Sequence, residues 1–192
     1  MAVSLNSSGF RTPGRAPAGT SAGSSRTLRP MRHPGSGDGF VLCSDGQMRW
    51  GLFGAAGVVF VTPRDGDLPL VMLQLRSGWS HEGGTWSCPG GALEYGEEPL
   101  AGALREASEE VGVPAEAARL LGEYVFDPAP EWQYTTVVVE VDGPFGLSMN
   151  FESDAVEWVP TDRVEQRDLH AGFAAAWPHV RPIAELAGAD PV

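Results

Sequence analysis

The sequence of 192 residues contains no lysine, only two cysteines and no apolar run long enough to cross a membrane. A membrane helix needs about 20 consecutive apolar residues, so the sequence predicts a chain that does not span a bilayer. Cys43 and Cys88 are too few for a disulfide framework, and they favour a reduced, cytoplasmic compartment. The 42% of apolar residues suffices for one good core, and we expect one folded domain.

Positive charge is scarce outside the N-terminal segment. The net charge is -12, but residues 1–37 contain five arginines and no acid, so the remainder holds eight arginines against 25 acids. A body this acidic repels nucleic-acid backbones. We therefore expect a small substrate that arrives with its metal ion, and no nucleic-acid polymer as a partner.

Residues 1–40 are rich in Gly, Ser, Pro and Arg and contain few apolar side chains. Such a segment cannot bury enough apolar surface to offset the entropy of ordering, so the sequence predicts a disordered tail. An acid-poor, Arg- and Ser-rich N-terminus also fits a transit peptide, and Met31 and Met48 are alternative start positions. From Met48 onward the pattern is that of an ordered domain.

A dense set of carboxylates lies at fixed spacing in the segment Gly91 to Val113, GALEYGEEPLAGALREASEEVGV. Pro99 suits the first turn of a helix, because its missing N–H would be unpaired there. The stretch 112–114, Gly-Val-Pro, supplies a stop. We predict a helix from Glu98 to Val111.

Three glutamates of this helix, Glu106, Glu109 and Glu110, fall in one narrow sector beside a second sector of apolar residues. Like charges three and four residues apart repel, and a cation would compensate them. Carboxylate oxygens suit Mg²⁺ or Mn²⁺. Two glycines precede the segment's first carboxylate, and they allow a backbone carbonyl, that of Gly90, to approach the same ion. For an arbitrary E-x-x-E-E pattern the alternative is a solvated acidic helix face.

The full spacing is G, five residues, E, seven residues, then R-E-U-x-E-E-x-G-U with U apolar, and residues 91–113 fill every specified position. This spacing resembles the signature of the Nudix hydrolases. The resemblance implies that Glu106, Glu109 and Glu110 ligate Mg²⁺ or Mn²⁺ and that Glu106 also accepts a proton from the attacking water. The implied reaction is substitution at phosphorus by water.

The resemblance also assigns roles around the glutamates. Arg105 and Glu97 would form an ion pair that fixes the loop against the helix and orients Glu106. Glu152, in a later loop, sits where many members of the family carry an acid that binds metal or acts as a base, and a surface carboxylate is the alternative. Glu94 remains undecided between metal contact through water and no contact.

Strand patterns of β-branched and aromatic residues flank the helix. They cover residues 50–62, 70–76, 120–126, 135–141 and 155–159, and residues 168–187 indicate a terminal helix that prolines kink or break. We predict an α/β fold, and the resemblance implies the Nudix α/β/α sandwich around a mixed sheet over residues 48–187. Trp50 to Val61 is a candidate exposed strand for a homodimer, by analogy with the family.

Substrate choice lies outside the helix motif. Aromatic side chains stack on nucleobases, and histidines contact phosphates. The candidates are Trp79, His81, Trp86, Trp132 and Phe173, each with ordinary core or loop packing as the alternative.

Three hypotheses for function follow. The first is Mg²⁺-dependent cleavage of a nucleoside triphosphate, oxidised or non-standard, to monophosphate and pyrophosphate. The second is cleavage of ADP-ribose or another nucleotide sugar, because Pro128 lies fifteen residues beyond the motif, as in pyrophosphatases of that specificity. The third is a non-catalytic Nudix module that senses a nucleotide.

Overall fold

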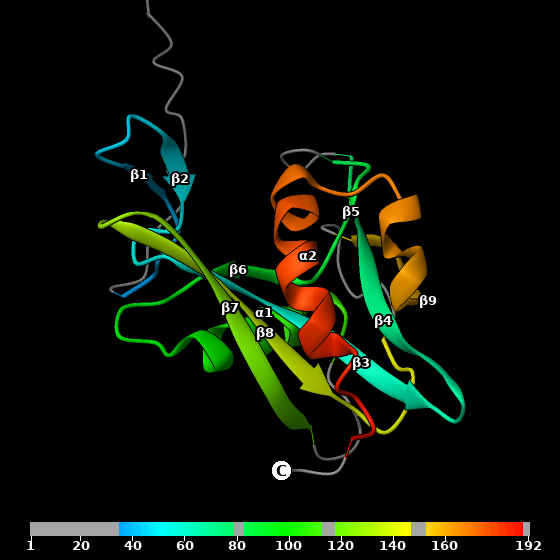
Figure 1. The fold of residues 1–192 in the computed structure, drawn as a ribbon. Helices are drawn as coiled ribbons and strands as arrows, with labels where there is room; N and C mark the ends of the chain where they lie inside the picture. Colours follow the sequence, from blue (N-terminus) through cyan, green and yellow to red (C-terminus); the bar gives the residue numbers. More distant parts are fainter. Residues whose placement is uncertain (1–34, 79–82, 113–117, 147–152, 190–192) are drawn as a thin grey trace, which may run out of the picture. The chain divides into compact units, whose positions relative to one another are not determined.

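The structure is a computed structural model that describes residues 35–78, 83–112, 118–146 and 153–189. These residues belong to a unit that runs from Arg32 to Val192. At its centre, β3 (Ala55–Arg64) pairs parallel with β8 (Trp132–Glu140) and antiparallel with β4 (Asp67–Arg76) (Figure 1). Parallel and antiparallel pairs in one sheet confirm the predicted mixed sheet.

The remaining strands extend this sheet on both sides, in the order β5-β4-β3-β8-β7. The outer strands β7 (Arg119–Ala129) and β9 (Ser153–Pro160) pair antiparallel with β8 and β4. Two short strands, β5 (Trp86–Ser87) and β6 (Gly90–Ala92), pair antiparallel with β4 and β3. β5 and β6 were not apparent from the sequence, because two or three residues are too few to show alternation.

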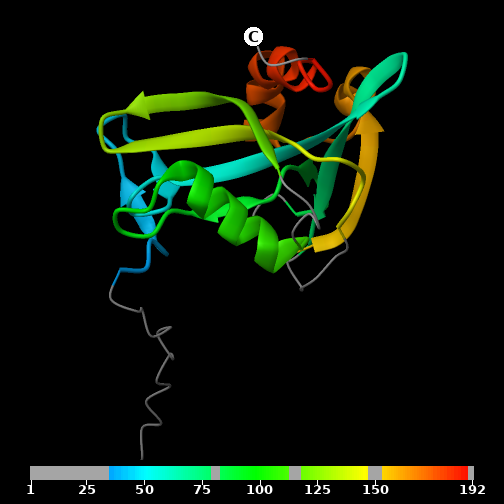
Figure 2. The ribbon, with the colours of Figure 1, turned by 90° about the horizontal axis from the view of Figure 1, so that it is seen from below.

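Two helices cover opposite faces of the sheet, as Figure 2 shows. α1 (Pro99–Glu110) packs Ala107 against one face, and α2 (Ala171–Ala184) packs Trp177 against the other; both side chains are fully buried. A sheet buried on both faces has strands that are apolar throughout, which explains why residues 55–62 are all buried. The α/β/α sandwich is thereby confirmed.

The predicted strand from Trp50 to Thr62 is in fact two strands. Trp50 ends β2 (Met48–Trp50), which pairs with β1 (Phe40–Leu42) in a separate two-stranded sheet. Gly51 and Gly54 have φ of 100° and 92°, a left-handed conformation that turns the chain before β3 begins. The ordered region, predicted to begin at Met48, therefore begins earlier, at β1.

Trp50 to Val61 was predicted to be an exposed strand for a homodimer, but the part of it that forms β3 is not exposed. β3 has hydrogen-bonded neighbours on both edges, and residues 55–62 are buried. Such a strand offers neither a free edge nor an exposed face to a second copy.

The terminal helix α2 begins later than predicted and is not broken. His170 caps it, because the ring Nδ1 accepts a backbone N–H from the first turn at 3.1 Å. Pro178 and Pro182 both lie inside the helix. Burial of Trp177, just before the first proline, and of Val180, between the two, holds the helix on the sheet and offsets the hydrogen bonds that the prolines remove. A short 3-10 helix, η1 (Thr161–Gln166), precedes α2. No helix in these described ranges is long and apolar enough to span a membrane.

Candidate active site

The acidic helix and the loop before it are held together closely. α1 starts at Pro99, and its last residue is Glu110, one residue short of the predicted Val111. Gly102 lies on the buried side of α1, where a Cβ would be 2.4 Å from Leu93 Cδ2 and 2.9 Å from Glu97 Oε2. A larger residue at 102 would therefore push the loop away from the helix.

Arg105 joins the loop to α1 through a two-pronged ion pair. Its Nε donates to Glu97 Oε1 at 2.9 Å, and its Nη2 donates to Glu97 Oε2 at 2.8 Å. Nη2 also donates to the Ala92 carbonyl at 3.0 Å, while Glu97 Oε2 accepts the Glu94 N–H at 2.9 Å. These hydrogen bonds, those from Arg105 first, hold the pKa of Glu97 below its ordinary value.

The same arginine reaches Glu106. Arg105 Nη1 donates to Glu106 Oε1 at 2.7 Å, which fixes one oxygen of that carboxylate. The carboxylate lies directly over Gly91, because a Cβ built there would be 2.5 Å from both Cδ and Oε2 of Glu106. The glycine thus leaves the space in which Glu106 sits against the backbone of β6.

Glu110 lies at the other end of this arrangement. Its side chain is buried, with 5% of the residue exposed, and Oε2 accepts the Gly90 N–H at 3.1 Å. Glu109 is exposed on the outer side of α1. The structure therefore brings Gly90, Glu106 and Glu110 to the junction of β6 and α1, with Glu109 beside them on the helix.

The oxygen donors at this junction fit a divalent cation in their chemistry. Carboxylates and a backbone carbonyl are ligands for Mg²⁺ and Mn²⁺. Within the part of the chain that is described, no three acidic, histidine or cysteine side chains already converge closely enough to hold an ion. Gly91 leaves room for Glu106, and burial of Glu110 makes a compensating cation favourable.

Several predicted site residues lie outside the described ranges: Trp79, His81 and Glu152. Trp86 lies in β5 and packs against the core cluster under α2. The guanidinium of Arg167 lies 5.8 Å from the centre of the Trp86 ring, a cation–π contact. One face of the Trp86 ring is therefore already partly used by the protein.

Trp132 and Phe173 are engaged elsewhere. Trp132 Nε1 donates to the Trp50 carbonyl at 2.9 Å, and the Arg49 guanidinium lies 5.5 Å from the centre of its ring. These contacts tie β8 to the β1–β2 hairpin. Phe173 is 5% exposed and packs with Trp177 in the core under α2. Its position gives Phe173 a packing role, and we leave it out of the proposed substrate site.

Two surface pockets lie near these elements. One, of about 520 Å³, lies at the turn between β7 and β8 and includes Phe53, Pro128 and Trp132. The other, of about 410 Å³, lies along β9 and η1 and includes Arg163 and Gln166.

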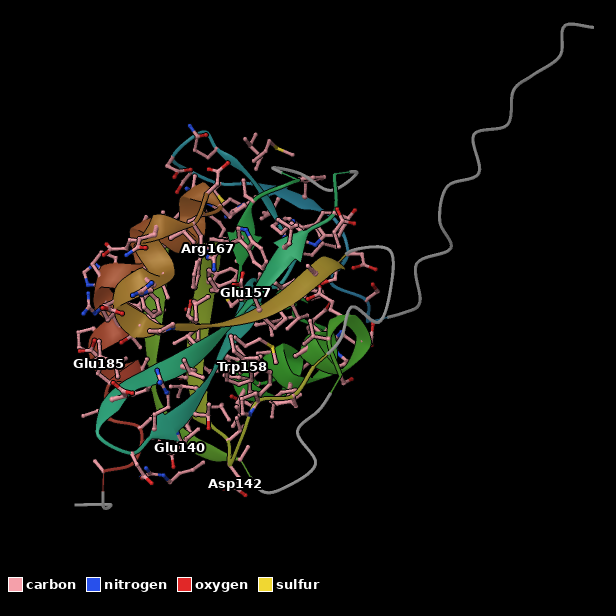
Figure 3. All side chains as sticks on the ribbon, turned by 90° about the vertical axis from the view of Figure 1, so that its right-hand side faces the viewer. Glu140, Asp142, Glu157, Trp158, Arg167 and Glu185 are labelled. Atoms are coloured by element: carbon pink, nitrogen blue, oxygen red, sulfur yellow. The ribbon has the colours of Figure 1, made fainter. Side chains whose placement is uncertain are left out.

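Figure 3 shows Glu157 and Arg167 at the second pocket, where they form an ion pair, while Glu140, Asp142 and Glu185 lie away from it. Sequence reasoning missed the arginines of this pocket, because no motif marks them.

Comparison with known proteins gives consistent matches. A family model described as the NUDIX domain matches residues 52–179. A Mycobacterium tuberculosis protein named "Putative 8-oxo-dGTP diphosphatase 3" is 41% identical over 152 residues, which cover 77% of this chain and 70% of that protein. A Bifidobacterium longum protein named "Nucleoside triphosphate pyrophosphatase/Nudix hydrolase fusion protein" is 40% identical over 147 residues, covering 74% of this chain and 30% of that protein.

A solved structure is also similar over most of the chain. The crystal structure of a Nudix hydrolase from M. smegmatis, RenU, is 36% identical and superimposes with a TM-score of 0.67. The superposition covers 81% of this chain and 100% of that one.

Proposed function

Because this chain belongs to the Nudix hydrolase family, a family of hydrolases that act on phosphorus-containing anhydrides, we propose that it cleaves a nucleoside triphosphate to a monophosphate and pyrophosphate. The favoured substrate is an oxidised or otherwise non-standard deoxynucleoside triphosphate. Two relatives that are 41% and 40% identical are named for action on 8-oxo-dGTP and on nucleoside triphosphates, which supports this choice.

The observation that carries this proposal is the hydrogen-bonded chain from Glu97 through Arg105 to Glu106. It holds one carboxylate oxygen of Glu106 at 2.7 Å from Arg105. A sensor that had lost catalysis would not need a carboxylate oriented in this way. The arrangement therefore favours an enzyme over a non-catalytic nucleotide module.

We propose that Glu106, Glu109 and Glu110, with the Gly90 carbonyl, hold Mg²⁺ or Mn²⁺. Glu152 is a further proposed ligand or base and lies outside the described residues. A divalent ion bound there lowers the pKa of a coordinated water and neutralises charge on the phosphate oxygens. Arg105 keeps Glu106 turned toward β6 by holding Oε1, and in this proposal the Glu106 carboxylate accepts the proton of the attacking water.

The proposed bond changes are those of hydrolysis. Oxygen of water adds to phosphorus, its proton passes to Glu106, and the bond from phosphorus to the bridging oxygen breaks. The bridging oxygen leaves with the second phosphate group. For a triphosphate, the products are a nucleoside monophosphate and pyrophosphate.

A second candidate is cleavage of ADP-ribose or another nucleotide sugar. Pro128, whose spacing from the motif suggested this specificity, lines the pocket at the β7–β8 turn together with Phe53 and Trp132. A pocket with aromatic walls can accept a second planar or sugar group. Such a substrate gives two phosphate monoesters and no pyrophosphate.

A phosphate-release screen with two coupling enzymes separates the candidates by product. Inorganic pyrophosphatase yields phosphate only from triphosphate cleavage, whereas alkaline phosphatase yields phosphate from the monoesters of ADP-ribose cleavage. We expect signal with pyrophosphatase, and a higher kcat/KM for 8-oxo-dGTP than for dGTP. Signal with ADP-ribose and none with triphosphates would reverse the order of the candidates.

Glu106→Gln tests the enzyme itself. We expect kcat to fall by about 10²- to 10⁴-fold, the usual contribution of a general base. Glu123→Gln is the matched control, because Glu123 is exposed on β7, away from the junction of β6 and α1. If no nucleotide turned over and Glu106→Gln left nucleotide affinity unchanged, the proposed site would be wrong.

A further inference from the structure

Gly57, in the middle of β3, faces a space that other polar groups fill. A Cβ built on Gly57 would lie 2.3 Å from Tyr134 Oη, 3.0 Å from Cys88 Sγ and 3.0 Å from the Pro89 carbonyl. The φ angle of Gly57 is not positive, so this glycine is needed for the space it leaves and not for a special backbone conformation. The missing side chain lets a hydroxyl, a thiol and a carbonyl meet at one point.

Tyr134 reaches this point from the neighbouring strand. Its backbone on β8 is opposite Ala55, and Gly57 is two residues further along the same face of β3. The Tyr134 side chain therefore crosses β3 diagonally over Gly57. On the far side its hydroxyl meets Cys88, which is buried and follows β5.

The Tyr134 hydroxyl and the Cys88 thiol are hydrogen-bonded to each other. Cys88 is buried, so water has little access to this contact. The hydroxyl therefore holds the Cys88 side chain in place next to Gly57.

This pair lies behind the segment that leads into the candidate metal site. Pro89 accepts the Val58 N–H at 3.0 Å, and Gly90 is paired with Gly57 across β3 and β6. The Gly90 N–H in turn donates to Glu110 at 3.1 Å. Residues 88–90 are therefore attached to β3 on one side and to Glu110 on the other.

We propose that Tyr134 is a positioning residue for the metal site, which acts through Cys88 to fix residues 88–90 so that the Gly90 carbonyl and Glu110 are presented to the same cation. This inference rests on the proposed function, because it requires that the junction of β6 and α1 binds a divalent metal. Tyr134 contacts neither metal nor substrate in this role. Its hydroxyl sets the path of the backbone, and the space over Gly57 admits that hydroxyl.

Tyr134→Phe tests the proposal in the full-length protein, with Mn²⁺ as the probe. Electron paramagnetic resonance of free Mn²⁺ measures binding without turnover. We expect the Mn²⁺ dissociation constant to rise roughly tenfold, in the range seen when partners behind metal ligands are removed. Tyr124→Phe is the matched control, because Tyr124 stacks on His179 at α2 and its hydroxyl has no place in the metal site; we expect it to bind Mn²⁺ as the parent does.

Gly57→Ala provides an independent second variant. Its Cβ would lie 2.3 Å from the Tyr134 hydroxyl oxygen and would displace it, so we expect Mn²⁺ binding to weaken by a similar factor. In the double variant Tyr134→Phe/Gly57→Ala the hydroxyl is already gone. The double variant should therefore raise the Mn²⁺ dissociation constant by less than the product of the factors measured for the two single variants.

Three outcomes would overturn the inference. The first is a Tyr134→Phe variant that binds Mn²⁺ as tightly as the parent. Even if its melting temperature fell, Tyr134 would then have only a structural role. Fully multiplicative effects in the double variant would overturn the inference as well. A parent that binds no Mn²⁺ would overturn both this inference and the proposed function, whereas normal binding in the parent confines the failure to Tyr134.

Discussion

Arg105 shows how one side chain organises several others. Its guanidinium donates to both oxygens of Glu97, to one oxygen of Glu106 and to the Ala92 carbonyl. The Arg105 and Glu97 side chains are 29% and 15% exposed, so solvent screens their interaction only in part. A lysine could not replace this arginine, because an ammonium group lacks the planar fork that matches a carboxylate.

At this scale we predict a pH dependence for Glu97→Gln. The pKa of Glu97 is lowered in the folded protein, chiefly by Arg105. The charged Glu97 side chain therefore stabilises the folded state fully above its unfolded pKa of about 4.3. This stabilisation is lost as the pH falls through the lower pKa of the folded state. At pH 7, Glu97→Gln should reduce the free energy of unfolding by about 1 to 3 kcal/mol. Below about pH 4 the difference from the parent should shrink.

Urea unfolding of both proteins between pH 3 and pH 7 checks this prediction. Asp67→Asn is the control, because the Arg64–Asp67 ion pair is 40% and 63% exposed, and removing it should change stability by less than about 1 kcal/mol. A Glu97→Gln deficit that stayed constant down to pH 3 would show that the charge of Glu97 is not the source of the stabilisation.

At the scale of elements, the site depends on the close approach of β6 to α1. Gly91 is the point of closest contact, because its missing Cβ leaves space for the Glu106 carboxylate. The obstructing atoms are the end of a flexible side chain and not backbone. An alanine at this position would therefore move Glu106 while the fold remains.

We expect Gly91→Ala to lower kcat by on the order of 10²-fold with little change in melting temperature, because a shift of about 1 Å in a reacting group has that effect. Gly143→Ala is the control, since a Cβ there meets no atom within 4 Å. Steady-state kinetics and thermal unfolding measure the two quantities. A loss of stability equal to the loss of activity would contradict the assignment of Gly91 to the site.

The carboxylates of α1 give a second prediction for this element. Mg²⁺ bound at the proposed site would stabilise the folded state by mass action, by about 2.7 kcal/mol at 100 times its dissociation constant. Mg²⁺ should therefore raise the melting temperature of the parent and raise that of Glu109→Gln/Glu110→Gln much less. Glu123→Gln/Glu165→Gln removes the same charge from exposed positions on β7 and η1 and should respond like the parent. Equal shifts in all three proteins would refute the metal site on α1.

Sequence patterns located the helix and the long strands but not the short ones. The helix was predicted within one residue at each end, because Pro99 and Gly112 mark its limits. β5 and β6 exist only because residues 86–87 and 90–92 pair with β4 and β3, and pairing partners cannot be read from the segments themselves. The break at Gly51 and Gly54 was missed because apolar residues continue across it.

For the whole molecule, the charge is divided between the N-terminal segment and the rest. Residues 1–37 hold five arginines and no acid, while the remainder carries eight arginines and 25 acids. The acidic part should repel polymeric nucleic acid. Apolar content in residues 1–37 is low, so this segment should contribute little to the stability of the domain.

We expect removal of residues 1–34, which lie outside the described ranges, to leave the melting temperature and kcat/KM for a nucleoside triphosphate unchanged within about twofold. The shortened protein should not bind duplex DNA at 0.15 M salt, as measured by fluorescence anisotropy of a labelled duplex. Tight DNA binding without this segment would contradict the prediction of a small-molecule substrate.

The sequence by itself determined how the acidic side chains of α1 are arranged, because a helix of known period fixes the relative directions of Glu106, Glu109 and Glu110, whatever the remainder of the chain does. Tertiary structure decided which groups meet that helix. Three contacts join segments that are separate in the sequence. A hydrogen bond links Gly90 of β6 to Glu110 of α1, and Gly91 packs closely on Glu106. Tyr134 of β8 crosses over Gly57 of β3. Contacts of this kind depend on strand order and register, which local patterns do not encode.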